Sequence, residues 1–256
     1  MAASILADNP AAEFALRMGD NVLILGQRVS AWCGLAPALE EDIALANTAL
    51  DLIGQAQMWL GLAGELEGKG RSADDLAYWR DTRAFRNCLL VEQENGDFGQ
   101  TLMRQFLFDA WHYPMLQALS KSTNERIAEI AEKSSKEAAY HVGRSSDLVI
   151  RLGGGTQESH DRMQRGLDTL WGFTGELTSA DGVDETLSAS GEAPSLDQIK
   201  ATYDTSVARA LGEATLTIPE NTFMRTGGKT GMHGEQFGFV LAEMQSVQRA
   251  HPGANW

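Results

Sequence analysis

The chain has 256 residues, of which 43% are hydrophobic, and a formal net charge of -14 at pH 7. A chain of this length buries roughly 70 to 75% of its unfolded surface, so it needs no disulfide or metal to fold. Its acidic balance repels phosphate backbones and anionic lipid, which excludes a nucleic-acid binder and a protein of the membrane surface.

Apolar residues recur at three- and four-residue spacing through most of the chain, whereas alternating Val, Ile and Thr runs are scarce. This periodicity predicts an all-α protein. In chain order we expect helices at residues 11–33, 39–67, 74–87, 98–119, 124–152, 157–178, 196–213 and 235–249. The main loops are expected at residues 179–194 and 226–234.

Several helix boundaries carry local signals. Asn9 is a candidate N-cap, and Pro10 suits the first helical position because its missing N–H would be unpaired there anyway. Ser72 and Asp75 have capping-box spacing, as do Ser195 and Gln198.

Two further signals concern the pair of helices in the middle of the chain. Pro114 should kink the helix at 98–119, because its ring removes one backbone hydrogen bond. The glycine triplet 153–155 should end the next helix, since glycine accepts the left-handed conformation at a helix exit.

Four long helices in two pairs, with a short helix and a long connection between the second and the third, match a bundle with one extended crossover. This is the ferritin-like arrangement. We therefore expect a ferritin-like four-helix bundle with additional helices, in a single domain of residues 1–256. Its core should contain Leu23, Leu50, Leu107 and Ile130.

Three acids, Asp51, Asp109 and Glu137, fall near the middle of that bundle. A di-iron bundle takes one Glu from each of two helices and a Glu-x-x-His pair from each of the other two, because positions i and i+3 share one face. Asp109 has its histidine at i+3, His112. The other two acids are followed at i+3 by Gly54 and Tyr140, and His141 comes one position late, about 100° around the helix.

Two interpretations of these groups remain. The acids and histidines could hold two irons or a single metal ion. The favoured interpretation is that they pair with each other and with basic residues, because buried charges need compensation; the candidate bases are Arg17, Arg28, Arg104 and Lys136. We therefore assign no catalytic residue and no metal ligand, and expect a degenerate polar cluster at the bundle centre, formed by Asp51, Asp109, His112, Glu137, Tyr140 and His141.

The run Gly228-Lys229-Thr230 resembles the end of a phosphate-binding loop. The first glycine of that motif would fall at Phe223, and no buried strand clearly precedes it. We expect a surface loop instead, with Arg225 and Lys229 available to a partner or to an anionic ligand. A plain acyl-CoA-binding module is the alternative that these two residues raise.

The remaining features indicate a soluble cytoplasmic protein. Cys33 and Cys88 lie far apart without CxxC spacing, as is typical of packed thiols in a reducing compartment. Residues 1–10 lack the basic and apolar regions of a secretory signal. The longest apolar stretch, residues 43–63, carries four Asn, Asp or Gln side chains, a density that lipid would not tolerate.

Several runs together resemble a known family, and the resemblance spans essentially the whole chain after a short N-terminal extension. The chain is similar to the C subunits of bacterial 1,2-phenylacetyl-CoA epoxidases, which act in phenylacetate degradation. The runs that carry the resemblance are residues 45–56 (LANTALDLIGQA), 90–96 (LVEQENG), 109–112 (DAWH), 136–141 (KEAAYH), 225–229 (RTGGK) and 241–245 (LAEMQ), with Trp256.

The resemblance implies a ferritin-like structural subunit that lacks the iron ligands and supports a separate catalytic A subunit, which carries the di-iron centre. The assembled enzyme of that family also has a flavin and iron–sulfur reductase. It uses NADPH and O2 to epoxidise the ring of phenylacetyl-CoA. We therefore expect a non-catalytic subunit without a cofactor of its own, held to a related helical partner by an apolar interface and able to form a homodimer alone. The alternative is a metal-dependent oxygenase in its own right.

Overall fold

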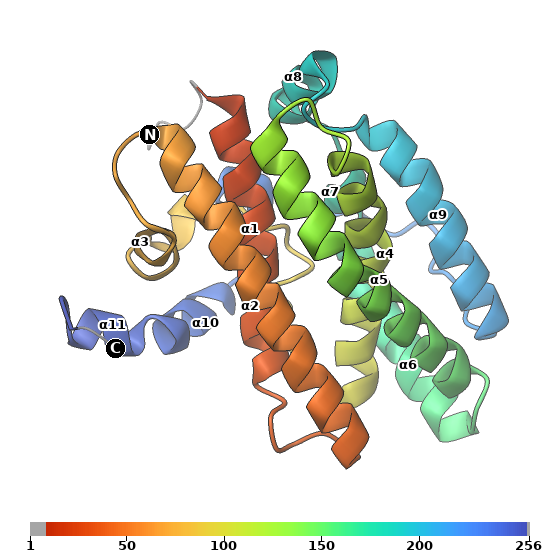
Figure 1. Cartoon of the computed structure of the whole chain (residues 1–256). Helices are drawn as coiled ribbons and strands as arrows, with labels where there is room; N and C mark the ends of the chain where they lie inside the picture. The colour runs from red at the N-terminus through yellow and green to blue at the C-terminus, as the bar shows by residue number, and fades with distance from the viewer. Residues whose placement is uncertain (1–8, 255–256) are drawn as a thin grey trace. The chain divides into compact units, whose positions relative to one another are not determined.

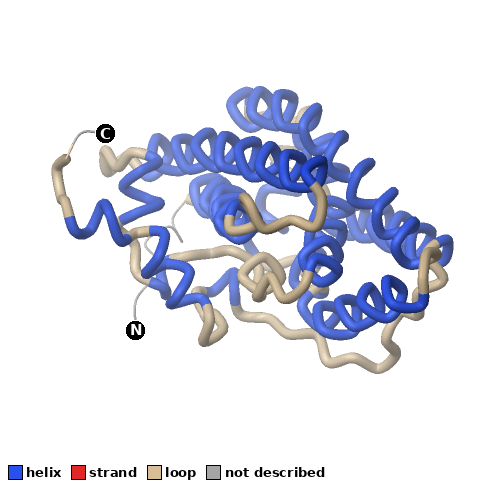
Figure 2. The backbone as a smooth tube through the Cα atoms, turned by 90° about the horizontal axis from the view of Figure 1, so that it is seen from below, coloured by secondary structure: helices blue, strands red, loops and turns tan. Residues whose placement is uncertain are grey.

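The computed structural model describes residues 9–254, and within that range every regular element is a helix and none is a strand. Figure 2 shows these helices joined by loops. The predicted all-α class is confirmed. Contacts divide the chain into two compact units. One combines the residues up to Gln93 with those from Gly227 onward, and the other comprises residues 94–226.

The first unit is built on α1 (Pro10–Ser30) and α2 (Leu39–Glu67), which pack along each other (Figure 1). Gly19 permits this close approach, because a Cβ there would lie 2.6 Å from Leu60 Cδ2. The shorter elements of this unit are α3 (Ala73–Tyr78), η1 (Thr82–Ala84), η3 (Gly228–Thr230), α10 (Phe237–Met244) and α11 (Ser246–Ala250).

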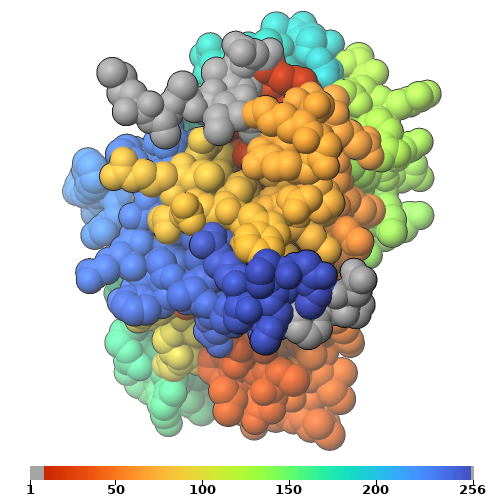
Figure 3. Space-filling view, turned by 90° about the vertical axis from the view of Figure 1, so that its left-hand side faces the viewer, coloured from red at the N-terminus to blue at the C-terminus, as the bar shows by residue number. Residues whose placement is uncertain are grey.

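The C-terminal helices of this unit lie against the segment after α2. Figure 3 shows the residues of α10 and α11, in blue, next to that segment, in yellow. Gln245 is buried and donates hydrogen bonds to the carbonyl oxygens of Ala77, at 3.0 Å, and Arg80, at 2.9 Å. Arg249 also donates to the Arg80 carbonyl, at 3.1 Å. Gln245 and Arg249 thus attach the C-terminal helices to α3 and to the residues between α3 and η1.

The second unit is built around α4 (Phe98–Leu119), which contacts α5 (Glu125–Gly153), α6 (Gln157–Leu170) and α9 (Leu196–Glu213). Figure 1 shows α4 and α5 side by side. The short elements η2 (Trp171–Phe173), α7 (Gly175–Thr178) and α8 (Gly182–Ser190) connect α6 to α9. A ferritin-like bundle would combine α1 and α2 with α4 and α5, and that arrangement, like the single domain, stays a prediction.

The sequence predicted many helix boundaries correctly. The helices at 39–67, 98–119 and 196–213 have the expected bounds. Asn9 Oδ1 accepts a hydrogen bond from the Ala12 N–H, and Ser72 forms the predicted capping box with Asp75. Ser195 also caps its helix, but through the Asp197 N–H and without the predicted capping box with Gln198.

Other boundaries were wrong. The helix expected at 74–87 ends at Tyr78, the one at 157–178 breaks into three elements, and the one at 235–249 into two. The loop expected at 179–194 contains α8, whose capping box is formed by Asp181 and Asp184. The elements observed in these regions are short, so their apolar residues cover too few turns to establish a helical period in the sequence.

The glycine triplet ends α5 for a reason other than the expected one. Gly154 has φ of -86° instead of a left-handed conformation. Gly153 is the residue that no larger one could replace, because a Cβ there would lie 2.6 Å from the Ala214 carbonyl oxygen. Close approach to the chain after α9 therefore selects glycine at this helix end.

The predicted core is partly confirmed. Leu23, Leu107 and Ile130 are buried, but Leu50 is 67% exposed. Cys88 is buried, whereas Cys33 is exposed, so the prediction of a packed thiol was wrong there. Within residues 9–254 no helix is long and apolar enough to cross a membrane.

Candidate functional site

The candidate site lies where α4 and α5 face each other inside the second unit. Gln105, Asp109 and His112 project from one face of α4, at spacings of four and three residues. His141 and Ser145 project from the facing side of α5. All five residues are buried. We call this set the Asp109 cluster.

Asp109 is held by neutral donors. Gln105 Nε2 donates to Asp109 Oδ1 at 2.7 Å, and Ser145 Oγ donates to Asp109 Oδ2 at 2.8 Å. Burial raises the pKa of Asp109 to about 6, although His141, the two hydrogen bonds and Arg144 oppose that rise. The carboxyl group therefore gains a proton more readily than an exposed aspartate does.

His112 is neutral for a related reason. Burial, together with the nearby charge of His141, lowers the pKa of His112 to about 3. Its ring stacks on Trp111, with 6.0 Å between centroids, and packs against Phe108 at 4.9 Å. His112 Nε2 is buried and makes no hydrogen bond to the described residues. The imidazole is thus buried in a site that disfavours its charged form.

The buried face of α5 differs from the predicted one, and Tyr140 and Glu137 do not lie where the sequence analysis placed them. Its buried residues are Ile127, Ile130, Ala131, Ser134, Ala138, His141, Ser145, Val149 and Gly153. Tyr140 is 60% exposed, so its placement at the bundle centre was wrong, and Glu137 is only half-buried. The residue three positions before the inward His141 is Ala138. The apolar positions of α5, and not its nearest acid, set the inward face.

Asp51 lies on α2, in the first unit. It is half-buried, and Gly54, three residues later, is exposed with nothing within 4 Å of an added Cβ. The fully buried polar side chain of this helix turn is Gln55. The i and i+3 positions that a di-iron motif would use for a ligand pair therefore lie away from the most buried side of α2.

Three of the predicted basic partners make contacts outside the Asp109 cluster. Arg17 Nε lies 3.2 Å from Glu13 Oε1, Arg28 donates to the Glu92 carbonyl oxygen, and Arg104 Nη2 donates to Asn95 Oδ1 at 2.7 Å. Lys136 is exposed. The hydrogen bonds at Asp109 come instead from an amide and a hydroxyl, so its burial is accommodated by a raised pKa as well as by donors.

These residues do not fit a di-iron centre. Such a centre takes four carboxylates and two histidines from the bundle. The α4 and α5 faces offer one buried carboxylate, which donors already occupy, and two histidines. Among residues 9–254 no group of three or more His, Cys, Asp or Glu side chains is arranged to hold a metal ion.

A second polar site lies in the first unit and was missed by the sequence analysis. Glu92 is 2% exposed and accepts three hydrogen bonds. They come from His233 Nδ1 at 2.7 Å, Asn87 Nδ2 at 3.1 Å and the Gly234 N–H at 2.7 Å. His233 Nε2 lies 3.2 Å from the Phe85 carbonyl oxygen. Both ring nitrogens of His233 thus face oxygen atoms of the protein.

The Glu92–His233 contact holds the glycine-rich loop, residues 226–234, in place. Gly231 lies in this loop with φ of +79°, and a Cβ there would lie 2.3 Å from the Arg83 carbonyl oxygen. The loop therefore lies directly on the η1 segment. The contact joins residues 141 positions apart, and sequence spacing carries no signal of such a pairing.

Arg225 and Lys229 belong to different units. Arg225 is exposed, and its guanidinium carbon lies 4.9 Å from the centroid of the Phe173 ring. Its backbone N–H donates to the Gly172 carbonyl oxygen at 2.7 Å. Lys229 is half-buried in η3. The resemblance to a phosphate-binding loop carries no function, since no strand precedes these residues in the described part of the chain.

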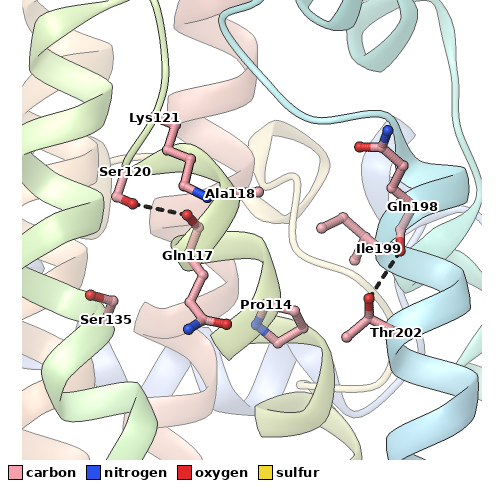
Figure 4. A pocket seen from close by; sticks show the side chains of 9 residues that line it. All are labelled: Pro114, Gln117, Ala118, Ser120, Lys121, Ser135, Gln198, Ile199 and Thr202. Carbon is pink, nitrogen blue, oxygen red and sulfur yellow. Dashed lines mark hydrogen bonds between the residues drawn. The ribbon is translucent and has the colours of Figure 1, made fainter.

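A groove in the second unit is a weaker candidate. It has a volume of about 500 Å³ and lies between α4, α5 and α9 (Figure 4). Three hydroxyls in its wall donate to carbonyl oxygens of the preceding helical turn, namely Ser120 to Gln117, Ser135 to Glu132 and Thr202 to Gln198. Lys121 is the charged residue of its lining, and no carboxylate or imidazole of the described residues lines it. The groove therefore offers no acid–base pair.

Comparison with known proteins assigns the chain to a protein family. The family model described as phenylacetic acid catabolic protein matches residues 3–256. The chain is also 46% identical over 248 residues to the C subunit of the 1,2-phenylacetyl-CoA epoxidase of Escherichia coli (strain K12). That alignment covers 97% of this chain and 100% of the relative. The resemblance noted in the sequence is therefore confirmed.

Proposed function

This chain belongs to the phenylacetic acid catabolic protein family, and from that membership we propose that it is the non-catalytic structural subunit of a 1,2-phenylacetyl-CoA epoxidase. The match to the C subunit of such an enzyme, over 100% of that relative, supports this role. In the proposed complex the catalytic A subunit holds the di-iron centre, and a separate reductase carries flavin and iron–sulfur groups. The complex acts in the cytoplasm, in aerobic phenylacetate catabolism.

The observation that carries the structural role is the chemistry of the Asp109 cluster. An oxygen-activating centre needs anionic ligands with open coordination positions. Asp109 has both oxygens occupied by donors, and burial raises its pKa. Ala138 stands three positions before His141, where a ligand pair would have its carboxylate. These features support a cluster that links α4 to α5 and binds no iron.

The experiment combines this chain with the catalytic A subunit and the reductase and follows epoxidation of phenylacetyl-CoA. We expect the catalytic subunit to lose activity or solubility without this chain. The double variant Asp109→Asn, His112→Gln keeps the approximate size of both side chains. It removes the carboxylate and the imidazole with which these two side chains could bind iron. We expect the complex with this variant to keep its rate within about threefold, since no reacting atom is removed.

Two results would contradict the proposal. A catalytic subunit that is fully active and soluble alone would remove the need for a supporting chain. A complex that assembles with the double variant but loses activity by more than about a hundredfold would place chemistry in this chain. The second outcome would favour the alternative of a metal-dependent oxygenase.

A further inference from the structure

Large apolar side chains are exposed along one side of α2. Leu39 is 71% exposed, Ile43 53%, Leu50 67% and Ile53 37%. At 100° per residue these four side chains fall within about 80° of one another on the helix surface. We call them the α2 stripe.

The opposite side of α2 is also apolar and is buried. Leu45, Leu52 and Trp59 have at most 1% of their surface exposed. A helix that is apolar on both sides is normally buried on both. Gly54 and Gly61 have nothing within 4 Å of an added Cβ, so the exposed side also has open positions where another backbone could approach. The α2 stripe thus has the composition of an interface.

Charges beside the stripe restrict what can cover it. The charged residues of α2 are all acidic: Glu40, Glu41, Asp42, Asp51, Glu65 and Glu67. Glu67 is paired with Arg71, at 2.6 Å, so the net negative charge lies toward the N-terminal half of α2. Glu40 and Asp42 flank the stripe on its two sides. A complementary surface would be apolar along its centre with Lys or Arg at its edges.

We propose that the α2 stripe is the surface on which the catalytic A subunit docks, through a helix whose apolar side is flanked by basic residues. This inference rests on the proposed function. A second copy of this chain fits less well, because each copy carries a net charge of -14 and would bring acidic edges to the same interface.

The test measures binding of the tagged catalytic A subunit to the full chain and to variants, by calorimetry. Leu50→Glu places a charge in the middle of the stripe. Phe239→Glu is the matched control, because Phe239 is 69% exposed on α10 and the substitution changes the charge equally. We expect Leu50→Glu to raise the Kd at least about tenfold and the control to change it less than about twofold.

A second pair of measurements tests the charges and the fold. Glu40→Gln combined with Asp42→Asn should weaken binding and make the Kd less sensitive to salt. Leu50→Glu should leave the Tm of the isolated chain unchanged within a few degrees, because the side chain is mostly exposed. An unchanged Tm separates loss of the interface from loss of the fold.

The outcomes distinguish this inference from the proposed function. If the wild-type chain binds the catalytic subunit and Leu50→Glu binds it equally well, the surface is wrong and the function stands. If the wild-type chain does not bind, both fail. If Phe239→Glu weakens binding as much as Leu50→Glu, the stripe does not dock the catalytic subunit. If Leu50→Glu leaves that binding unchanged and lowers only the oligomeric mass of the isolated chain, the stripe binds another copy of this chain instead.

Discussion

Ser145 Oγ on α5 lies 2.8 Å from Asp109 Oδ2 on α4, and both side chains are at most 1% exposed. This bond joins two helices through a buried carboxyl group. Removing the hydroxyl leaves Asp109 with one fewer donor in a buried site. The stability of the second unit should therefore depend on Ser145.

Ser145→Ala should lower the free energy of unfolding by about 1 to 3 kcal/mol, the usual cost of leaving a buried polar group without its partner. Ser135→Ala is the control on the same helix, because Ser135 Oγ donates to the Glu132 carbonyl oxygen one turn earlier. Chemical denaturation measures both. Equal effects from the two substitutions would show that the Asp109 bond contributes nothing.

Asp109→Asn should change how stability depends on pH. The pKa of Asp109 in the fold, about 6, lies above the ordinary value of 3.8. The stability from this group is therefore fully present below the ordinary value and is lost as the pH rises through the folded value. Relative to Asp109→Asn, the wild type should lose roughly 2 to 3 kcal/mol between about pH 4 and pH 8. Denaturation at several pH values would reveal parallel curves if this assignment were wrong.

His112→Gln should act with the opposite sign. The pKa of His112 in the fold, about 3, lies below the ordinary value of 6.5. As the pH falls below 6.5, His112 becomes protonated in the unfolded chain while it stays neutral in the folded chain. This group therefore destabilises the fold in acid. The variant should retain more stability than the wild type does on acidification, by about 1.4 kcal/mol per pH unit at most. Unchanged acid sensitivity would contradict a neutral buried imidazole.

Gly231→Ala should disrupt the glycine-rich loop. The residue has a positive φ, and a Cβ would approach the Arg83 carbonyl oxygen far inside van der Waals contact. We expect a loss of about 2 kcal/mol or more. Gly238→Ala is the control, because Gly238 lies in α10 with nothing within 4 Å of an added Cβ and should gain up to about 1 kcal/mol. Thermal unfolding compares the two; a harmless Gly231→Ala would refute the close contact.

Glu92→Gln should loosen the same loop from the other side. The substitution keeps the size of the side chain and removes the charge that faces His233. The Gly234 N–H, which donates to Glu92 Oε1, should exchange with solvent at least about tenfold faster. Glu94→Gln, at a nearby acid on the same segment, should leave that exchange rate unchanged. Protection equal to that of the wild type would mean that backbone contacts alone hold the loop.

The sequence predicted the long helices because their periods extend over many turns and their caps are local. Asn9 and Ser72 act through residues three positions away. The register of α5 was harder to predict. An acid at position 137 suggested a ligand, but apolar residues such as Ile127 and Ala138 determine which side faces inward. One residue corresponds to about 100° of rotation, so a one-position error exchanged an exposed Tyr140 for a buried His141.

The same limits apply to α2 and to the second polar site. Leu50 was assigned to the core because leucine is usually buried, yet α2 is apolar on more sides than one neighbour can cover. Glu92 and His233 meet only through tertiary structure, and no local rule connects them. The sequence alone could therefore predict the class and the long elements, but not the facing of each side chain.

The iron content of the isolated chain tests the central claim most directly. The chain would be loaded with ferrous iron without oxygen, separated from free metal and analysed together with the Asp109→Asn, His112→Gln variant. We predict no stoichiometric iron in either protein. About two irons per wild-type chain, the number that a carboxylate-bridged centre requires, with loss of both in the variant, would contradict the account.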